Sequence, residues 1–124
     1  MDLNIAVELK EGLLRVTASG NFTLDAALRL LKEVCDTATE KQVDKILVNG
    51  LSMEGELPTL DRYQLGAEIA AYLKQHGMNH RLAIVGKAPT LNGFAVRVAE
   101  NRGVTTAMFS SEQEALNWLS AWKG

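Results

Sequence analysis

A short run at positions 81–86, RLAIVG, indicates the architecture of this chain more clearly than any other stretch. All four residues from Leu82 to Val85 are apolar, whereas a strand covered on only one face alternates apolar with polar residues. Strands without that alternation are typical of parallel sheets that are covered on both faces. We therefore expect residues 81–86 to form an interior strand of a mostly parallel sheet.

The segments that flank this strand repeat a strand–helix unit. Strands separated by helices of ordinary length are joined by right-handed crossovers, and they lie parallel. Two serines at 110–111, with Gln and Glu three positions on, have the pattern of a capping box for a last helix. The predicted elements are strands at 45–49, 81–86 and 104–109, helices at 59–76 and 91–101, and a final helix after residue 111.

The N-terminal part of the chain predicts a hairpin. Residues 3–9 and 14–19 alternate apolar with polar side chains, and Glu11-Gly12 between them can form a tight turn. One face of the first strand is then expected to be buried. Its apolar residues are Leu3, Ile5, Val7 and Leu9.

A long helix follows the hairpin. Thr23 can cap its first turn, and an apolar stripe from Leu24 to Ala38, which includes Cys35, can lie against a sheet. The complete order is ββαβαβαβα, an α/β arrangement with an N-terminal hairpin, a mostly parallel sheet and four helices.

The composition is that of a folded protein. The chain has 124 residues, of which 47% are hydrophobic and 23% charged, and its formal net charge is -2. Because this length is ordinary for one domain, we expect a single domain over residues 1–124. The balance of apolar and charged residues excludes an intrinsically disordered chain.

The same features bear on location and on classes of partner. No apolar run approaches the roughly 18 residues that span a bilayer, so we expect no integral membrane segment. Residues 1–4 lack the basic start of a signal peptide, which predicts a cytoplasmic protein. The slightly acidic balance disfavours nucleic acid as a partner, since binding to it requires the neutralisation of phosphates.

In a parallel sheet, the loops that leave the carboxyl ends of the strands meet at one edge, where helix amino termini present free amides. The expected loops at this edge are 20–23, 49–59, 86–90 and 109–111. The second exceeds the roughly two to six residues that are usual for such a connection. Its excess length suggests a function.

The glycines of this loop do not make a phosphate site. Gly50 and Gly55 have the spacing of a P-loop, but Glu56-Leu57 stands where Lys-Ser/Thr is needed to hold phosphate and magnesium. We therefore expect no bound cofactor; free amides at the starts of the second and third helices are the remaining place where a mononucleotide could bind.

The sequence also lacks a set of residues with the spacing of metal ligands. His76 and His80 are four residues apart, but Gly77 ends the predicted helix between them, so we expect both on the surface and facing different ways. The single cysteine, Cys35, cannot build a thiolate cage by itself. The sequence predicts no metal site.

The predicted helix at 59–76 has two apolar stripes instead of one. A neighbouring helix could bury the second stripe, or a partner protein or second copy could cover it. The first stripe consists of Leu65, Ile69, Tyr72 and Leu73, and the second of Leu60, Tyr63, Ala67, Ala70 and Ala71.

The element order, the segment GELPT at 55–59 and the closing pattern F-x4-EAL-x-WL at 109–119 together resemble the SpoIIAA-like proteins. These are bacterial relatives of the STAS domain, and they share its fold with the CRAL-TRIO lipid-binding domains. The resemblance spans essentially the whole chain. It implies a right-handed superhelix of β/α units and a binding or regulatory module rather than a catalyst.

In the sigma-pathway members of that family, a partner kinase phosphorylates a serine in an Asp-Ser-Ser/Thr-Gly segment after the third strand. The matching region here is NGLS at 49–52, so the motif is absent. Ser52 and Thr59 are the remaining hydroxyl residues, and the resemblance makes them possible phosphorylation sites. Thr59 is also a suitable N-cap for the helix that follows.

Three functional hypotheses follow. The first is a non-catalytic regulatory module that docks a protein partner, or its own copy, on the surface around the 49–59 loop and the second helix. The alternative is a carrier or sensor of a small hydrophobic or lipid-like ligand, which needs an apolar cavity of about 300–1,000 Å³. The predicted partner or ligand surface consists of Asn49, Ser52, Glu54, Glu56, Thr59, Arg62, Leu65, Ile69 and Tyr72.

The third hypothesis is an enzyme in which Glu54 or Glu56 acts as general acid or base. It requires a cleft beside the loop and a raised pKa, and nothing in the surrounding sequence predicts either. We therefore do not expect catalysis.

Overall fold

The computed structural model describes residues 3–75 and 80–121. Its elements follow the predicted order ββαβαβαβα, which confirms the expected fold class. They are β1 (Leu3–Lys10), β2 (Leu13–Asn21), α1 (Leu24–Lys41), β3 (Lys45–Glu54), α2 (Thr59–Gln75), β4 (Arg81–Val85), α3 (Phe94–Asn101), β5 (Thr105–Phe109) and α4 (Glu112–Ser120).

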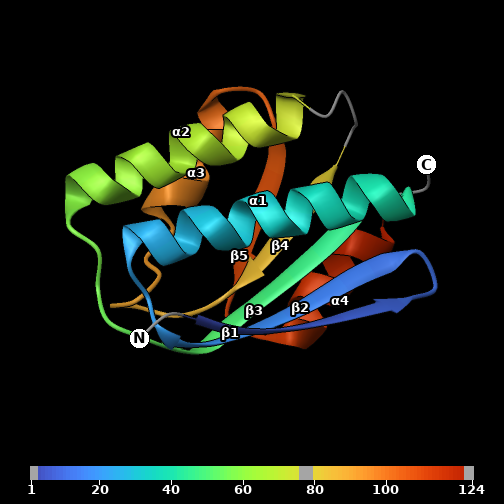
Figure 1. Cartoon of the computed structure of the whole chain (residues 1–124), viewed down its shortest axis with the longest axis horizontal. Helices are drawn as coiled ribbons and strands as arrows, with labels where there is room; N and C mark the ends of the chain where they lie inside the picture. Colours follow the sequence, from blue (N-terminus) through green and yellow to red (C-terminus); the bar gives the residue numbers. More distant parts are fainter. Residues whose placement is uncertain (1–2, 76–79, 122–124) are drawn as a thin grey trace.

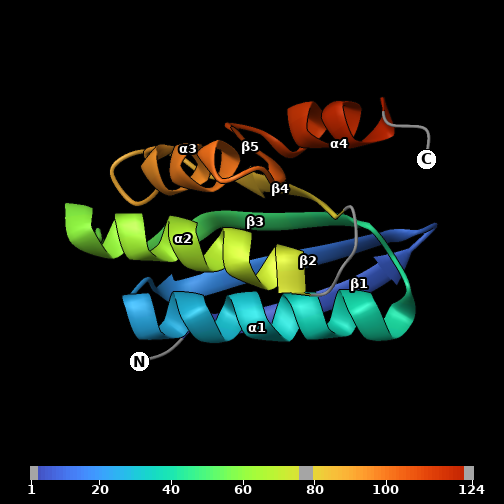
Figure 2. The same ribbon diagram turned by 90° about the horizontal axis from the view of Figure 1, so that it is seen from above.

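The strands form one mixed sheet in the order β1-β2-β3-β4-β5. β1 pairs antiparallel with β2, and the other neighbours pair parallel. Because the spatial order follows the chain order, successive right-handed crossovers place their helices on the same face. Figures 1 and 2 show α1, α2 and α3 side by side over that face, whereas α4 lies on the opposite one.

The sheet separates two apolar clusters. The larger one packs beneath α1 and α2, and Leu82 belongs to it. The smaller one packs beneath α4, and Ala83 and Val85 belong to it. Residues 82–85 are thus covered on both faces, as their unbroken apolar run predicts.

Two of the predicted helix caps are confirmed. The Thr23 hydroxyl accepts a hydrogen bond from the Ala26 amide at 3.2 Å. The Ser111 hydroxyl accepts one from the Glu114 amide at 3.3 Å and caps α4. It also donates to the Glu114 carboxylate at 3.2 Å, in place of the bond from the Ser111 backbone amide that would complete a capping box.

The prediction that Thr59 caps α2 is wrong. The Pro58 carbonyl accepts the first helical hydrogen bond, from the Arg62 amide at 3.0 Å. Pro58 therefore takes the cap position, and Thr59 is the first residue of the helix.

β3 is longer than predicted and extends to Glu54. The pairing register with β2 shifts between Thr17, which lies opposite Asn49, and Ser19, which lies opposite Ser52, so β3 has one extra residue. Such a bulge reverses the alternation of side chains beyond it, and it brings Met53 into the core. The connection to α2 is then only residues 55–58, so the argument from excess loop length is wrong.

Two other expectations need correction. α3 begins at Phe94 and not at Leu91. The Asn92 side chain accepts a hydrogen bond from the Phe94 amide at 3.0 Å, and Gly93 has a φ of 84°, which is not helical. His80 is buried, since it leads directly into interior strand β4. His76 and Gly77 lie outside the described residues.

β1 is less covered than its alternation predicts. Leu3 and Ile5 pack against the larger cluster, but Val7 is 46% exposed and Leu9 is 49% exposed. One half of the expected buried face of β1 is therefore open.

α2 and α3 are in tight contact at Gly66. A Cβ built there would lie 2.7 Å from the Cβ of Val98 and against the Ala95 carbonyl oxygen. Neither atom belongs to a flexible side-chain end, so only glycine fits without a shift of one helix.

Replacement of Gly66 by Ala tests this contact. Alanine favours helix by about 1 kcal/mol over glycine, whereas overpacking a tight core costs about 1–3 kcal/mol. We expect the overpacking to dominate and Gly66→Ala to lower the free energy of unfolding by about 1 kcal/mol in urea titrations. Gln64→Ala, at an exposed position of the same helix, is the control, and a stabilised Gly66→Ala variant would contradict the close approach.

Candidate functional site

The carboxyl ends of β2, β3, β4 and β5 lie at one edge of the sheet, because these strands are parallel. The segments that leave them are 22–23, 55–58, 86–93 and 110–111. Two backbone hydrogen bonds tie neighbouring segments together, from Phe22 N to Glu54 O at 2.7 Å and from Gly86 N to Phe109 O at 3.0 Å. This edge is the predicted location of function.

Arg62 braces this edge and is not available as a docking residue. Its side chain is buried, and it donates hydrogen bonds to the carbonyls of Leu57 and Pro89, each at 2.8 Å. Its guanidinium also lies 3.8 Å from the Glu56 carboxylate. Arg62 thus joins two of the connecting segments, in contrast to its predicted place on a partner surface.

Two further residues of the predicted surface belong to the core. Leu65 and Ile69 are buried beneath α2, and Tyr72 is half-buried and packs against the same cluster. The stripe that they form faces the sheet, so a partner cannot reach Leu65 or Ile69 without unfolding the helix.

The second stripe of α2 is divided between a neighbouring helix and solvent. Ala70 is buried, and α3 packs along α2 at Gly66. Leu60, however, is 81% exposed and Tyr63 is 48% exposed. The Tyr63 hydroxyl accepts a hydrogen bond from Arg102 at 2.7 Å, and the guanidinium carbon of Arg102 lies 5.6 Å from the Tyr63 ring centroid.

The exposed members of the predicted surface lie next to these two residues in the chain. Ser52, Glu54, Glu56 and Thr59 are all exposed. We call Glu54, Glu56, Thr59, Leu60 and Tyr63 the α2-start surface.

The interior holds an apolar cavity of about 70 Å³ between α1, α2 and the sheet. Among the residues that line it are Phe22, Cys35, Met53, Leu65 and Ile69. Burial raises the pKa of the Cys35 thiol to about 12, so the thiol stays protonated and unreactive. The cavity is well below the about 300–1,000 Å³ of ligand pockets, and it gives no support to the ligand-carrier alternative.

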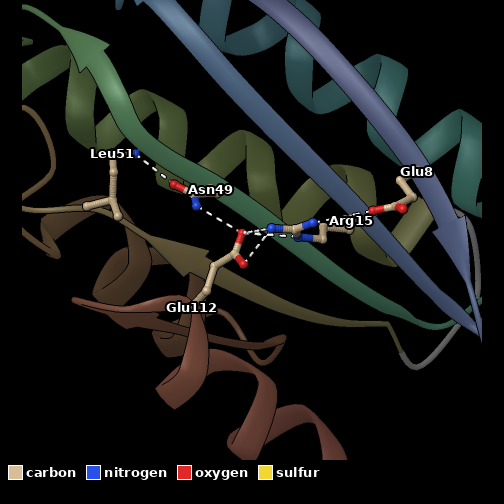
Figure 3. A network of polar contacts seen from close by, with 5 residues as sticks. All are labelled: Glu8, Arg15, Asn49, Leu51 and Glu112. Atoms are coloured by element: carbon tan, nitrogen blue, oxygen red, sulfur yellow. Dashed lines mark hydrogen bonds and ion pairs between the residues drawn. The ribbon is translucent and has the colours of Figure 1, made fainter.

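Asn49 belongs to a polar network on the α4 side of the sheet (Figure 3). Its side-chain amide donates a hydrogen bond to the Glu112 carboxylate at 2.9 Å. Its side-chain oxygen accepts one from the Leu51 amide at 3.0 Å, so this backbone N–H at the bulge of β3 is hydrogen-bonded. The Arg15 guanidinium donates to both Glu112 oxygens, at 2.6 and 2.8 Å, and lies 3.3 Å from the Glu8 carboxylate. Glu112 begins α4, so the network fixes this helix to β2 and β3.

Sequence reasoning missed this network. Arg15 and Glu112 are separated by 97 positions, and each has an ordinary place in its own element. The Arg15 hydrogen bonds hold the pKa of Glu112 below its usual value, despite partial burial, and the same contact raises the pKa of Arg15. The pair is therefore charged at neutral pH and anchors α4; it is not an acid–base pair.

The described residues hold no arrangement that suggests metal or membrane chemistry. Within 3–75 and 80–121, no three His, Cys, Asp or Glu side chains are grouped so that they could hold a metal ion. None of the helices in those ranges is sufficiently long and apolar to cross a bilayer.

The Arg15–Glu112 pair predicts a pH dependence of stability. The folded-state pKa of Glu112 is depressed, so the pair stabilises the fold above the unfolded value of about 4.3 and is lost as pH falls through the folded pKa. We expect Glu112→Gln to lower the free energy of unfolding by about 1 kcal/mol at pH 7. The loss should shrink toward zero as pH falls below the folded-state pKa of Glu112, in urea titrations at several pH values. Glu33→Gln, at an exposed site on α1, is the control, and a loss that is constant with pH would contradict the assignment.

Comparisons with known proteins identify the fold. No family model matches the chain, and no curated protein matches its sequence. An anti-sigma factor antagonist from Mycobacterium paratuberculosis superposes with a TM-score of 0.68 at 14% identity, over 96% of this chain and 95% of that one. The anti-sigma factor antagonist SpoIIAA in its unphosphorylated form gives 0.57 at 15% identity, over 96% and 100%.

An uncharacterised protein with a SpoIIAA-like fold from Shewanella loihica is 23% identical, with a TM-score of 0.55 over 95% of this chain and 93% of that one. These likenesses span nearly the full length of both chains in each comparison. The chain therefore has the SpoIIAA-like fold.

Proposed function

We propose that this protein is a non-catalytic regulatory module that binds a protein partner through the α2-start surface. The observation that carries the proposal is the position of Leu60, which is 81% exposed at the carboxyl edge of the sheet. A large apolar side chain in such a position gains free energy when a partner covers it.

The surroundings of Leu60 support docking over catalysis. Tyr63 lies one turn further along the same helix and is held by Arg102, so it offers a pre-oriented aromatic contact. Glu54 and Glu56 are exposed to solvent rather than set in a cleft, which does not suit a general acid or base. Two of the structural neighbours are anti-sigma factor antagonists, so an anti-sigma factor is the class of partner to test first.

Replacement of Leu60 by Asp tests the surface. Because Leu60 is almost fully exposed, the variant should keep the stability of the wild type, whereas a charge at the centre of an apolar contact must be desolvated on binding. We expect at least a roughly tenfold loss of affinity, which corresponds to about 1.4 kcal/mol. The measurement is calorimetric titration against each anti-sigma factor of the source organism.

Glu33→Lys, on the exposed side of α1, is the matched control and should bind like the wild type. Equal affinities for wild type, Leu60→Asp and Glu33→Lys toward a true partner would place the docking surface elsewhere. A catalytic turnover by the isolated chain would overturn the non-catalytic assignment.

The proposal includes control by phosphorylation at Thr59 or Ser52, both of which are exposed. Phosphate on Thr59 would favour the amino terminus of α2, but it would also place about two negative charges beside Leu60 and in the contact. We expect Thr59→Glu to weaken partner binding and Thr59→Ala to leave it unchanged in the same titrations. Equal affinities for these two variants would argue against control at Thr59.

A further inference from the structure

The two edges of the sheet are protected to very different degrees. β5 is five residues long, and both α3 and α4 contact it. β1 is eight residues long, and of its apolar residues only Leu3 and Ile5 pack against the core. In the described residues no strand pairs with the outer side of β1, which Figure 1 shows at the edge of the sheet.

Soluble proteins usually blunt such an edge with proline, a bulge, charged side chains or a covering helix. β1 carries the charges of Glu8 and Lys10 near its end, but it has neither of the first two devices. Residues 3–10 contain no proline, and their pairing with β2 runs without a register shift from Leu3 opposite Gly20 to Lys10 opposite Leu13. β1 is thus a regular strand whose outward backbone groups can pair with another strand.

The side chains of this edge add an apolar stripe to the free backbone. Val7 and Leu9 are 46% and 49% exposed, and together with Ile5 they lie on the same face of the strand because side chains alternate. An added strand with apolar residues in the same alternation would extend this stripe.

We propose that β1 pairs antiparallel with β1 of a second copy of this chain, about a two-fold axis at Val7, to form one continuous sheet. In this register Val7 of one copy lies opposite Val7 of the other, and Ile5 of each copy lies opposite Leu9 of the other. The complementarity of the strand with itself identifies a second copy as the occupant, because every large apolar residue from Ile5 to Leu9 meets another on the same face.

Charge agrees with this register. Lys10 lies opposite Asn4 and Glu8 opposite Ala6, and each Glu8 keeps its own Arg15 at 3.3 Å. A shift of the axis by one residue toward Lys10 would place Glu8 directly opposite Glu8, which is unfavourable. The pairing is also isologous, as closed dimers require.

Light scattering coupled to size-exclusion chromatography tests the proposal on the full chain. We expect a dimer for the wild type at high micromolar concentration and a monomer for Val7→Lys/Leu9→Lys, whose side chains are half exposed and tolerate replacement. Circular dichroism checks that this variant is folded. Leu60→Lys, at a more exposed leucine on α2, is the control and should remain dimeric.

Val7→Cys supplies a test that keeps a small side chain at the axis. Opposed Cα atoms in an antiparallel pair lie about 4.5–5.5 Å apart, within the about 4.4–6.8 Å range of disulfides. Mild oxidation should link Val7→Cys into a covalent dimer and leave Leu60→Cys without a covalent cross-link, while buried Cys35 does not compete.

A monomeric wild type, a dimer that survives the double lysine variant, or equal cross-linking of the two cysteine variants would overturn the proposal. These outcomes leave the proposed function intact, because its surface is on α2 and its test is the affinity of a partner.

Discussion

The arrangement of the whole protein depends on the fact that β2, β3, β4 and β5 are added to the sheet in chain order. Right-handed crossovers then carry α1, α2 and α3 to one face, and only α4 remains to cover the other. A helix is about 10 Å wide and strands are about 4.8 Å apart, so one helix covers about two strands. α4 contacts β3, β4 and β5, and β2 reaches it through Leu13 and Arg15.

This limited coverage explains why the polar network lies beside α4. The apolar contacts of α4 are few, and the Arg15–Glu112 pair adds charge-assisted hydrogen bonds from β2 to its first residue. Asn49 donates a hydrogen bond to the same carboxylate, and it accepts one from the Leu51 amide at the bulge. The Asn49 side chain thereby fixes both the first residue of α4 and the path of β3 toward α2.

Local patterns predicted the elements, and they failed where the outcome depends on distant residues. Alternation in residues 3–19 predicted the hairpin, and the unbroken run at 82–85 predicted the interior strand. The alternation overstated the burial of β1, where Val7 and Leu9 are about half exposed. The bulge in β3 broke the period of two after Asn49, so the strand looked like a long loop. In α2, Leu60 and Leu65 are chemically identical, and only the placement of α1, α3 and the sheet leaves one exposed and the other buried.

The interior and the surface point to different kinds of function. The cavity is small, apolar and lined by core residues, whereas the most exposed large apolar side chains lie on β1 and α2, and Leu51 on β3 is exposed to a lesser degree. Since α2 forms no part of the β1 edge, a dimer joined through β1 would present two copies of the α2-start surface. Two linked copies bind a dimeric partner more tightly than one copy, because the second contact forms within an existing complex. Dimerisation through the sheet edge would thus strengthen docking through Leu60 without changing any contact at that surface.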